Sequence, residues 1–387
     1  MGVCIHKELC GGCLYQGVLY EEQLRIKRNL TDKLLDQRDL YPTEHLGFQP
    51  APQIYRYRNK MEYTFGDLVK GGPMTLGLHQ KGSFMSVLTV DECQLVDEDF
   101  NVILDAVLTF SEKKGYRNYN KKNHQGLLRH LVIRKGVRTQ ELLVHLVTSS
   151  QGSFDSQGFL DVLLNLTPYL HNTIIGVLHT YNDSKADAVK SDKTEILFGR
   201  DYYRERIMGL DFQVGAFSFF QTNVAAAERL YQEALSILPE HTDKVIVDLY
   251  CGTGTITQTL ATKAKKVIGV EIVEDAVNSA LENAKRNNLT NCEFILGDVL
   301  NTVEALKEKP DILVMDPPRN GIHPKALMKI IELDIPQILY ISCNPTTMTE
   351  NIHVMKEAGY ILEKWKGYDN FPFTRHIEAV GYLTKAE

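Results

Sequence analysis

The stretch Asp248-Leu-Tyr-Cys-Gly-Thr-Gly-Thr-Ile256 decides the fold. It continues an apolar run that begins at Val245, and the glycines at 252 and 254 let the backbone turn sharply before a helix. As a dinucleotide-binding fingerprint the stretch is incomplete, because Thr257 stands where the third glycine is required. Taken alone, it predicts either a ligand-binding turn or a tight strand-to-helix connection without a ligand.

The sequence on either side of this turn alternates between strand-like and helix-like segments. Helical stretches at 274–288, 324–332 and 346–358 separate further apolar runs at 267–270, 293–296, 312–315 and 338–341. Near-continuous apolar strands between helices indicate βαβ units around a buried parallel sheet. We therefore expect an α/β domain of the doubly wound, Rossmann-like kind over residues 215–387.

The first half of the chain has a different pattern. Short alternating runs at 55–65, 129–134, 142–147 and 174–179 are broken by Gly and Asn, which favours a mainly antiparallel α+β region. An amphipathic helix at about 21–37 precedes these runs and could pack on the second domain. No Pro/Gly/Ser linker marks the boundary, and we place the first domain at 1–214.

Composition narrows the class of protein. The chain has 387 residues with 43 Lys and Arg against 49 Asp and Glu, so a net charge of −6 gives no support for polyanion binding. Seven cysteines, an odd number, suit thiols that act as ligands or nucleophiles in a reducing compartment. No apolar run of membrane-spanning length and no secretory leader is evident, so we expect a cytoplasmic protein without a membrane partner.

Acidic residues follow successive strands of the predicted parallel sheet. Glu271 ends the second strand, where an acid can bind two ribose hydroxyls, Asp298 follows the third, and Asp316-Pro-Pro-Arg319 follows the fourth. Any one of them alone is more often a helix cap. Because the carboxyl ends of parallel strands share one rim, the set predicts a ligand site there.

Two further residues have the chemistry of a reacting pair. Cys343 leaves the fifth strand on this rim just before a helix whose N-terminus favours thiolate, and Glu378 begins the last strand. If that strand runs antiparallel, both side chains face one pocket. Beside a methyl donor, such a pair has a specific use: thiolate addition to carbon 6 of uracil makes carbon 5 nucleophilic, and a base must later remove the carbon 5 proton. Inert packing for Cys343 and an exposed edge carboxylate for Glu378 are the alternatives.

The second half resembles the S-adenosylmethionine-dependent methyltransferases in its glycine turn and strand-end acids. The resemblance implies cofactor contacts at Tyr250, Gly252, Gly254, Thr255, Glu271 and Asp298. Amino-group methyltransferases often have an aromatic residue after the two prolines, whereas Arg319 stands here. That difference points away from methylation of an exocyclic amine.

Four short motifs together resemble the RNA uridine-5-methyltransferase family. They are F-x-Q-T-N at 219–223, D-P-P-R-N-G at 316–321, S-C-N-P at 342–345 and H-I-E at 376–378. The resemblance implies Cys343 as nucleophile, Glu378 as base, Gln221 as a cofactor contact, and Asp316 near both the methyl donor and the uracil. Phe371 and Phe373 could wall a pocket for a base taken out of its stack, or could be core residues.

The cysteines near the start of the chain predict a second site. Cys4, Cys10 and Cys13 are clustered and Cys93 is remote, a spacing that favours an iron–sulfur cluster over zinc and zinc over unliganded thiols. A 4Fe-4S cluster of this pattern typifies the ribosomal-RNA members of the family that the chain resembles. Many of those members also begin with a β-barrel RNA-binding module (TRAM), for which the residues before Cys4 leave no room.

RNA contact is then expected from the α+β region, the cysteines and the rim. On a strand, Arg56, Arg58 and Lys60 would form a basic row, with Arg129, His130, Arg134 and Lys135 as a second basic group. The alternative is an ordinary solvated strand face.

These observations predict a Rossmann-like methyltransferase domain joined to an N-terminal α+β domain that carries an iron–sulfur site. The expected activity is formation of 5-methyluridine in RNA, with 23S ribosomal RNA favoured and no obligate protein partner. The alternatives are a transfer-RNA or cytosine-5 methyltransferase, and an iron–sulfur RNA-binding protein without catalysis.

Overall fold

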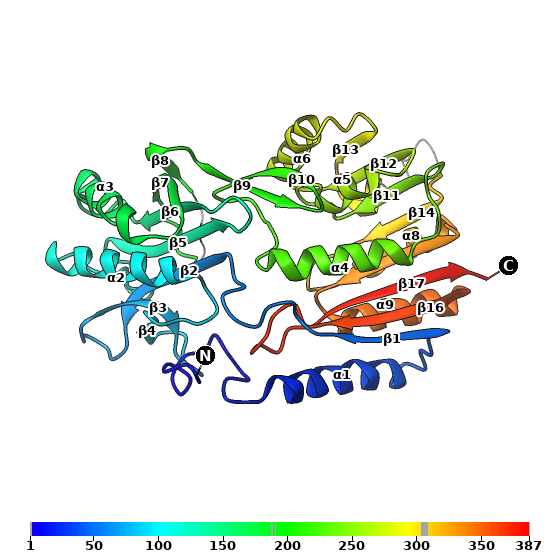
Figure 1. The fold of residues 1–387 in the computed structure, drawn as a ribbon, viewed down its shortest axis with the longest axis horizontal. Helices are drawn as coiled ribbons and strands as arrows, with labels where there is room; N and C mark the ends of the chain where they lie inside the picture. Colours follow the sequence, from blue (N-terminus) through cyan, green and yellow to red (C-terminus); the bar gives the residue numbers. More distant parts are fainter. Residues whose placement is uncertain (1, 187–188, 190, 303–308, 387) are drawn as a thin grey trace.

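The computed structural model describes residues 2–186, 189, 191–302 and 309–386, and places two sheets side by side (Figure 1). The larger sheet has eight strands. In spatial order they are β1 (Glu44–Gln49), β16 (Tyr360–Tyr368), β17 (Glu378–Lys385), β15 (Gln337–Ser342), β14 (Ile312–Met315), β11 (Val245–Leu249), β12 (Lys266–Glu271) and β13 (Cys292–Leu296). Only β17 runs antiparallel to its neighbours, β15 and β16.

Helices cover both faces of this sheet, because its central strands are buried on both sides. They are α4 (Val224–Ile237), α5 (Thr255–Ala261), α6 (Glu274–Arg286), α7 (Val299–Thr302), α8 (Pro324–Glu332) and α9 (Pro345–Glu357). One core contains α8, α9 and Trp365 of β16. The other contains α4, α5 and the hairpin of β9 (Tyr202–Ile207) and β10 (Leu210–Gly215). The α/β methyltransferase-like domain expected from the sequence is therefore present.

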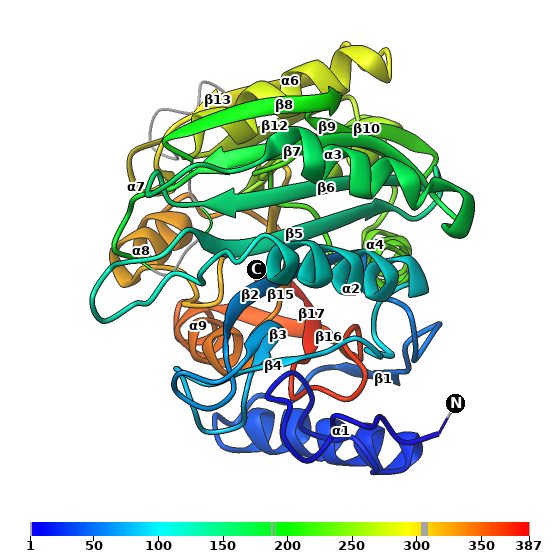
Figure 2. The ribbon, with the colours of Figure 1, turned by 90° about the vertical axis from the view of Figure 1, so that its left-hand side faces the viewer.

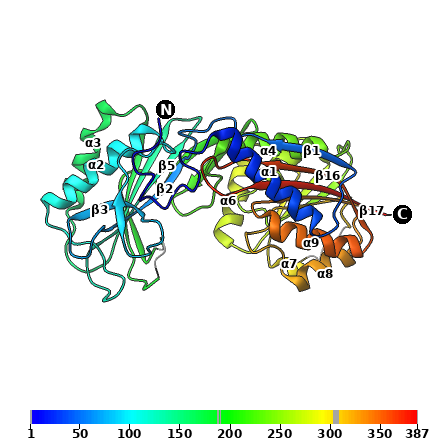
Figure 3. The same ribbon diagram turned by 90° about the horizontal axis from the view of Figure 1, so that it is seen from below.

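The N-terminal segment extends this domain. α1 (Tyr20–Asp36) packs against α9 and β1, and β1 pairs in parallel with β16 at the sheet's edge (Figure 3). The helix lies on the second domain, as its amphipathic pattern suggested. A single boundary at 214 does not describe this arrangement, because β1 comes from the first 50 residues and completes the second domain's sheet.

The smaller sheet has seven strands. In order they are β4 (Val87–Thr89), β3 (Met74–His79), β2 (Lys60–Asp67), β5 (Leu128–Gly136), β6 (Glu141–Thr148), β7 (Thr173–Tyr181) and β8 (Lys193–Gly199). All neighbours are antiparallel except β6 and β7. α2 (Glu98–Lys113), α3 (Ser156–Asn165) and the short η1 (Thr167–Tyr169) accompany the sheet, and α2 and α3 pack on one face of it (Figure 2). This is the predicted α+β region.

Leu143 and Leu178 of the smaller sheet share a core with β9 and β10, so the hairpin joins the two parts of the molecule. Of the helices in the described residues, none has the length and apolar character needed to cross a lipid bilayer.

Candidate active site

The glycine turn after β11 opens the backbone at the rim of the larger sheet. Tyr250, Gly252 and Gly254 all have left-handed φ values, of 65°, 54° and 78°. A Cβ on Gly254 would lie 2.9 Å from the Phe294 ring, so both conformation and packing require glycine there. A Cβ on Gly252 would meet nothing within 4 Å, which leaves the backbone open on that side. Thr255 begins α5 directly after the turn.

The two acids expected to bind the cofactor lie beside this turn. Glu271 accepts N–H bonds from Gly252 at 3.0 Å and from Ile272 and Val273 at 2.9 Å each. A carboxylate offers about four lone-pair sites, so one stays available for a ligand. Asp298 accepts the Leu300 N–H at 2.9 Å. Burial, and then Asp298, raise the pKa of Tyr250 to about 12. The structure thus gathers the expected cofactor residues at one edge.

The register of β15 against β17 places Cys343 beside Glu378. Ser342 pairs with Ala379 in this antiparallel ladder, so Cys343 and Glu378 occupy the next two facing positions. Side chains that face each other across such a ladder have Cβ atoms about 5 Å apart. The antiparallel course expected for the last strand therefore brings the two predicted reacting residues together.

A small cavity lies beside Glu378, and Cys343 is not among the residues that line it, so the structure does not show both side chains in one pocket. Its lining includes Gln221, Tyr231, Asp316, Asn370 and Glu378. Gln221 donates from Nε2 to the Tyr231 hydroxyl at 2.9 Å. Gln221, Asp316 and Glu378 were predictable from the sequence, whereas Tyr231 and Asn370 were not, because nothing in their local sequence distinguishes them from core and loop residues.

Burial dominates the electrostatics of the site. It raises the pKa of Asp316 to about 7 and the pKa of Glu378 well above its ordinary value; Asp316 raises the latter further, whereas Arg319 opposes the rise. Burial, then Glu378 and Asp316, raise the pKa of Cys343 to about 11, again against Arg319. In the free protein, therefore, burial and the two carboxyl groups raise the pKa of the thiol, in the direction opposite to that expected from the following helix.

Arg319 is the cation at this site. Its guanidinium contacts the ring of His376, and its carbonyl oxygen accepts an N–H from the Asn344 side chain at 2.9 Å. Burial, followed by Arg319, lowers the pKa of His376 to about 4, so this ring is neutral at pH 7. Two of the recognised motifs, D-P-P-R and H-I-E, thus meet through one side-chain contact.

Phe373 does not wall this pocket. It is buried in a separate core with Tyr57 and Leu95, and its ring lies 5.2 Å from that of Tyr55. Phe371 is partly buried and packs against Tyr57 and the His376 ring. The core alternative for Phe373 is therefore the correct one.

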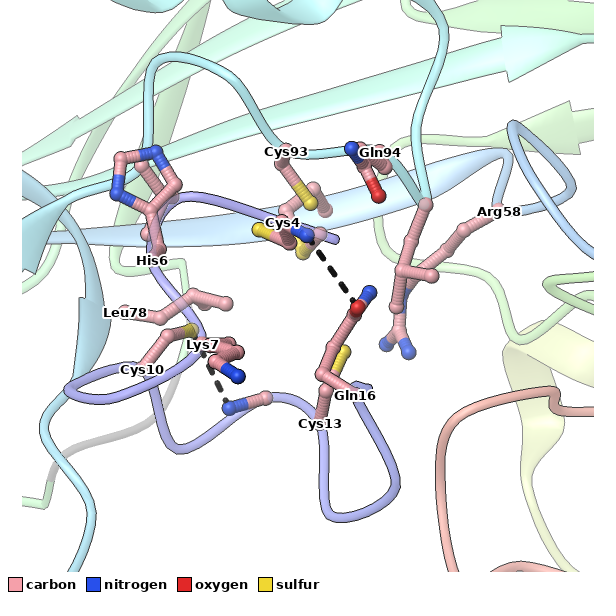
Figure 4. A pocket seen from close by; sticks show the side chains of 14 residues that line it. Cys4, His6, Lys7, Cys10, Cys13, Gln16, Arg58, Leu78, Cys93 and Gln94 are labelled. Atoms are coloured by element: carbon pink, nitrogen blue, oxygen red, sulfur yellow. Dashed lines mark hydrogen bonds between the residues drawn. The ribbon is translucent and has the colours of Figure 1, made fainter. Parts of the chain in front are cut away.

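The four N-terminal cysteines converge. Cys4, Cys10, Cys13 and Cys93 line one cavity together with Lys7 and Arg58 (Figure 4). Burial, then the other three thiols, raise the pKa of Cys13 to about 12, which reflects how close the sulfur atoms lie. In the described residues, however, no group of three or more His, Cys, Asp or Glu side chains is arranged to hold a metal ion.

The predicted basic row does not form. Arg56 has a φ of 52° and β2 begins only at Lys60, so these side chains do not share a strand face. Arg56 pairs with Glu98, Lys60 with Glu62 and Lys135 with Asp97. In the second group, Arg129 and Arg134 are buried and donate to backbone carbonyls, those of Asn182 and Ser218 among them. These charges serve internal contacts.

Comparison with known proteins identifies the family. A family model described as tRNA (Uracil-5-)-methyltransferase matches residues 186–386. An uncharacterized RNA methyltransferase of Clostridium tetani is 48% identical over 98% of this chain and 82% of its own length. One of Leptospira interrogans is 35% identical over 99% of this chain and 98% of its own length.

A solved structure agrees with these relatives. The Pyrococcus abyssi tRNA (uracil-54, C5)-methyltransferase, in complex with S-adenosyl-L-homocysteine, matches with a TM-score of 0.78 and 27% identity, over 97% of this chain and 86% of its own. The chain therefore belongs to the tRNA (uracil-5-)-methyltransferase family and is an adenosylmethionine-dependent RNA methyltransferase.

Proposed function

We propose that the protein forms 5-methyluridine in RNA, with Cys343 as nucleophile and Glu378 as base. The observation that carries this proposal is the β15–β17 register: Ser342 pairs with Ala379, so Cys343 and Glu378 directly follow the end of the ladder, and Glu378 lines a cavity with Asp316 and Gln221. A single pyrimidine ring needs both groups within reach at once, the thiol at carbon 6 and the carboxylate at carbon 5.

The chemistry follows from this pair. The Cys343 thiolate forms a bond to carbon 6, and the electron pair of the 5,6 double bond moves toward the carbonyl oxygen at carbon 4. Adenosylmethionine supplies the activated methyl group that carbon 5 then takes. Glu378 removes the remaining proton from carbon 5, the 5,6 double bond forms again, and the sulfur leaves from carbon 6. Cys343 is then free again as a thiolate, Glu378 carries the proton from carbon 5 until it passes to solvent, and the ring is 5-methyluracil.

The raised pKa values fit these roles in two ways. A carboxylate with a raised pKa is a stronger base once it has lost its proton, which suits removal of a proton from carbon. The Cys343 thiol must lose its proton before attack, and Arg319 is the protein cation that stabilises its thiolate. We infer that Arg319 tunes both reacting groups.

We assign the donor to the rim beside this pair. Tyr250 with the glycine turn (Gly252, Gly254 and Thr255), Glu271 and Asp298 would hold its nucleoside and amino-acid parts, and Gln221 and Asp316 would lie toward the methyl group. Support comes from the gathering of these residues at one edge and from the S-adenosyl-L-homocysteine complex of the Pyrococcus abyssi relative. Backbone opened at Gly252 allows close approach of a ligand.

We also propose that Cys4, Cys10, Cys13 and Cys93 hold a 4Fe-4S cluster. All four line one cavity, and backbone N–H groups donate to the sulfur of Cys10, from Gly12, and to that of Cys93, from Leu95 and Val96. Zinc–sulfur bonds of about 2.3 Å need four sulfurs crowded around a single ion. In a cluster each thiolate binds its own iron, so the four sulfurs need not meet at one ion. The methylation chemistry does not need this group, whose role we take to be structural or RNA-facing.

The RNA target we favour is 23S ribosomal RNA, on the ground of this four-cysteine cavity. The Pyrococcus abyssi relative acts, by its name, on uracil 54 of transfer RNA, so transfer RNA is the second candidate. Free thiols throughout the described residues suit a reducing compartment, and we place the enzyme in the cytoplasm.

Nucleoside-resolved mapping of RNA from cells with and without this gene tests the proposal. We expect one 5-methyluridine, in 23S ribosomal RNA, to disappear with the gene and to return with the wild-type protein. Loss of 5-methylcytidine instead would support the cytosine alternative, and an unchanged RNA would support a binding protein without catalysis.

Complementation with Cys343→Ala should fail to restore the methyluridine. Cys292→Ala is the matched control, because burial also raises the pKa of Cys292 to about 11 while the residue begins β13, away from the rim. Restoration by Cys343→Ala would remove that residue as nucleophile.

A further inference from the structure

The loop between β16 and β17, residues 369–377, leads directly into the proposed base. The ladder of these strands ends where Tyr368 faces Glu378, so Glu378 is the first residue after the loop. Asn370 of the loop also lines the active-site cavity, and its carbonyl oxygen accepts an N–H from the Asn223 side chain at 2.7 Å. The position of Glu378 therefore depends on how this loop is held.

One face of α1 holds the start of the loop. Lys27 and Gln23 lie one helical turn apart and are both buried. Lys27 Nζ lies 2.6 Å from Asp369 Oδ1, with 1% and 0% of the two side chains exposed, and it also donates to the Phe371 carbonyl at 3.1 Å. Gln23 Oε1 accepts the Phe373 N–H at 2.9 Å.

The cysteine-bearing segment holds the middle of the loop. The N–H groups of Leu14 and Tyr15, which directly follow Cys13, both donate to the Phe373 carbonyl at 2.9 Å. The buried Tyr57 hydroxyl donates to the Pro372 carbonyl at 2.9 Å. The N–H and the carbonyl of Phe373 are thus both hydrogen-bonded to residues from the first 25 positions of the chain, the N–H to Gln23 and the carbonyl to Leu14 and Tyr15.

The backbone of Phe373 indicates what these contacts do. Its φ of 64° is left-handed, a conformation that a bulky aromatic residue keeps only where the surroundings impose it. The surroundings here are the N-terminal contacts and the Tyr55 ring. The loop's shape therefore comes from its partners rather than from its own sequence.

Stability alone does not account for the ion pair. Taking Lys27 and Asp369 out of water costs about as much as their attraction returns, so an apolar pair would serve packing equally well. A charged pair instead fixes one geometry, since a shifted loop would leave a charge buried and unpaired. The segment around Cys343 has contacts of its own: the Asn344 N–H donates to Ser342 Oγ, and the Asn344 side chain donates to the Arg319 carbonyl.

We propose that Gln23, Lys27 and Tyr57 are positioning residues for the base: they hold the 369–377 loop so that Glu378 reaches carbon 5 of the bound uracil. This inference rests on the proposed function. It assigns them to proton removal and elimination, and not to the attack by Cys343 or to methyl transfer. An RNA substrate should therefore still be attacked and methylated when the loop is loosened, but released slowly.

The test compares Lys27→Met and Tyr57→Phe with Arg38→Gln. Arg38 follows α1 and pairs with Glu350 of α9 at 2.6 Å. Arg38→Gln therefore removes an ion pair in the same region, but not one with the loop. Each variant is mixed with adenosylmethionine and substrate RNA, and kcat, KM and the fraction of protein covalently bound to methylated RNA on a denaturing gel are measured.

Because a displacement of about 1 Å can cost on the order of 100-fold in rate, we expect kcat to fall between about 10-fold and 100-fold in both loop variants. In Lys27→Met and Tyr57→Phe we expect KM to be unchanged and the covalent adduct to accumulate, whereas Arg38→Gln should behave as wild type. Hydrogen exchange at the Phe373 amide should be faster in Lys27→Met and in Tyr57→Phe.

Tyr57→Phe removes one hydroxyl and keeps the ring, so it tests the positioning role of these residues even if Lys27→Met does not fold. Slower turnover without adduct, or a higher KM at unchanged kcat, would overturn the proposal. If the wild-type protein forms neither adduct nor 5-methyluridine, the proposed function fails and this inference with it. If the wild-type protein turns over normally while Lys27→Met and Tyr57→Phe form no adduct, the proposed function stands and only this inference is refuted.

Discussion

Cys343 is a neutral thiol in the free protein at pH 7, because burial, Glu378 and Asp316 raise its pKa to about 11 and Arg319 only partly opposes them. Alkylation by iodoacetamide reports the thiolate, so its rate at Cys343 should rise with pH up to about 11. Arg319→Gln should move that rise to higher pH. Cys292 gives the internal control, since burial alone raises its pKa and Arg319→Gln should leave it unchanged. A rate that is already flat from neutral pH would contradict this account of the thiol.

The two glycines of the turn differ in what they tolerate. Alanine at position 254 would have to adopt a left-handed φ and would also press against the Phe294 ring. Alanine at position 252 would have the left-handed φ but no steric contact. We expect Gly254→Ala to lower the free energy of unfolding by about 2 to 3 kcal/mol and Gly252→Ala by about 1 to 2 kcal/mol. Denaturant unfolding of the two variants measures the difference, and equal losses would show that the contact with Phe294 relaxes freely.

At the level of helices and strands, the parallel sheet was predictable almost residue by residue. The runs at 245–249 and 312–315 became β11 and β14 with the same bounds, because strands buried on both faces are apolar throughout. β1 was not predictable. Its sequence, Glu44-His-Leu-Gly-Phe-Gln49, has little apolar alternation, and its place at the sheet edge is decided by pairing with β16, some 300 residues away.

The active-site pairing was predictable for a related reason. Once the last strand is antiparallel, the register follows from which residues are buried, and it places Cys343 opposite Glu378. The basic groups were not predictable, because the sequence does not show which arginines meet internal carbonyls. Arg129 and Arg134 look like surface cations and are instead buried donors.

The smaller sheet contains a pH-sensitive element in β6 and β7. His145 Nε2 lies 2.7 Å from Thr180 Oγ1 and His179 Nε2 lies 2.9 Å from Thr148 Oγ1. Burial lowers their pKa values from 6.5 to about 3 and about 4. Below pH 6.5 these histidines are therefore protonated in the unfolded chain but still neutral in the folded sheet. The free energy of unfolding accordingly falls as the pH drops from 6.5 toward 3.

Each of these histidines contributes a slope of up to about 1.4 kcal/mol per pH unit in that window. Denaturant unfolding across it should give a shallower slope for His145→Gln combined with His179→Gln than for the wild type. An unchanged slope in the double variant would contradict the burial account.

On the scale of the whole molecule, the N-terminal segment links two sites. Residues 4–16 carry three of the four cysteines, α1 and β1 complete the larger domain, and both parts contact the 369–377 loop beside Glu378.

If the cysteine cavity holds a cluster, protein purified without oxygen should be brown and contain about four irons and four sulfides per chain. Colourless protein with one zinc per chain would reverse the assignment. Cys13→Ser should lower the iron content and speed hydrogen exchange at Phe373, since the two N–H donors to that residue follow Cys13 directly.

The central claim is that a sulfur at 343 and a carboxylate at 378 act on one uracil. Mass spectrometry of Glu378→Gln mixed with adenosylmethionine and substrate RNA tests it most directly, with Glu363→Gln, whose carboxylate accepts from Thr384 on the same hairpin, as the control. The account predicts a stable adduct between Cys343 and a methylated uracil in Glu378→Gln, and free product from the control. Normal product release by Glu378→Gln, or an adduct at any other cysteine, would contradict it.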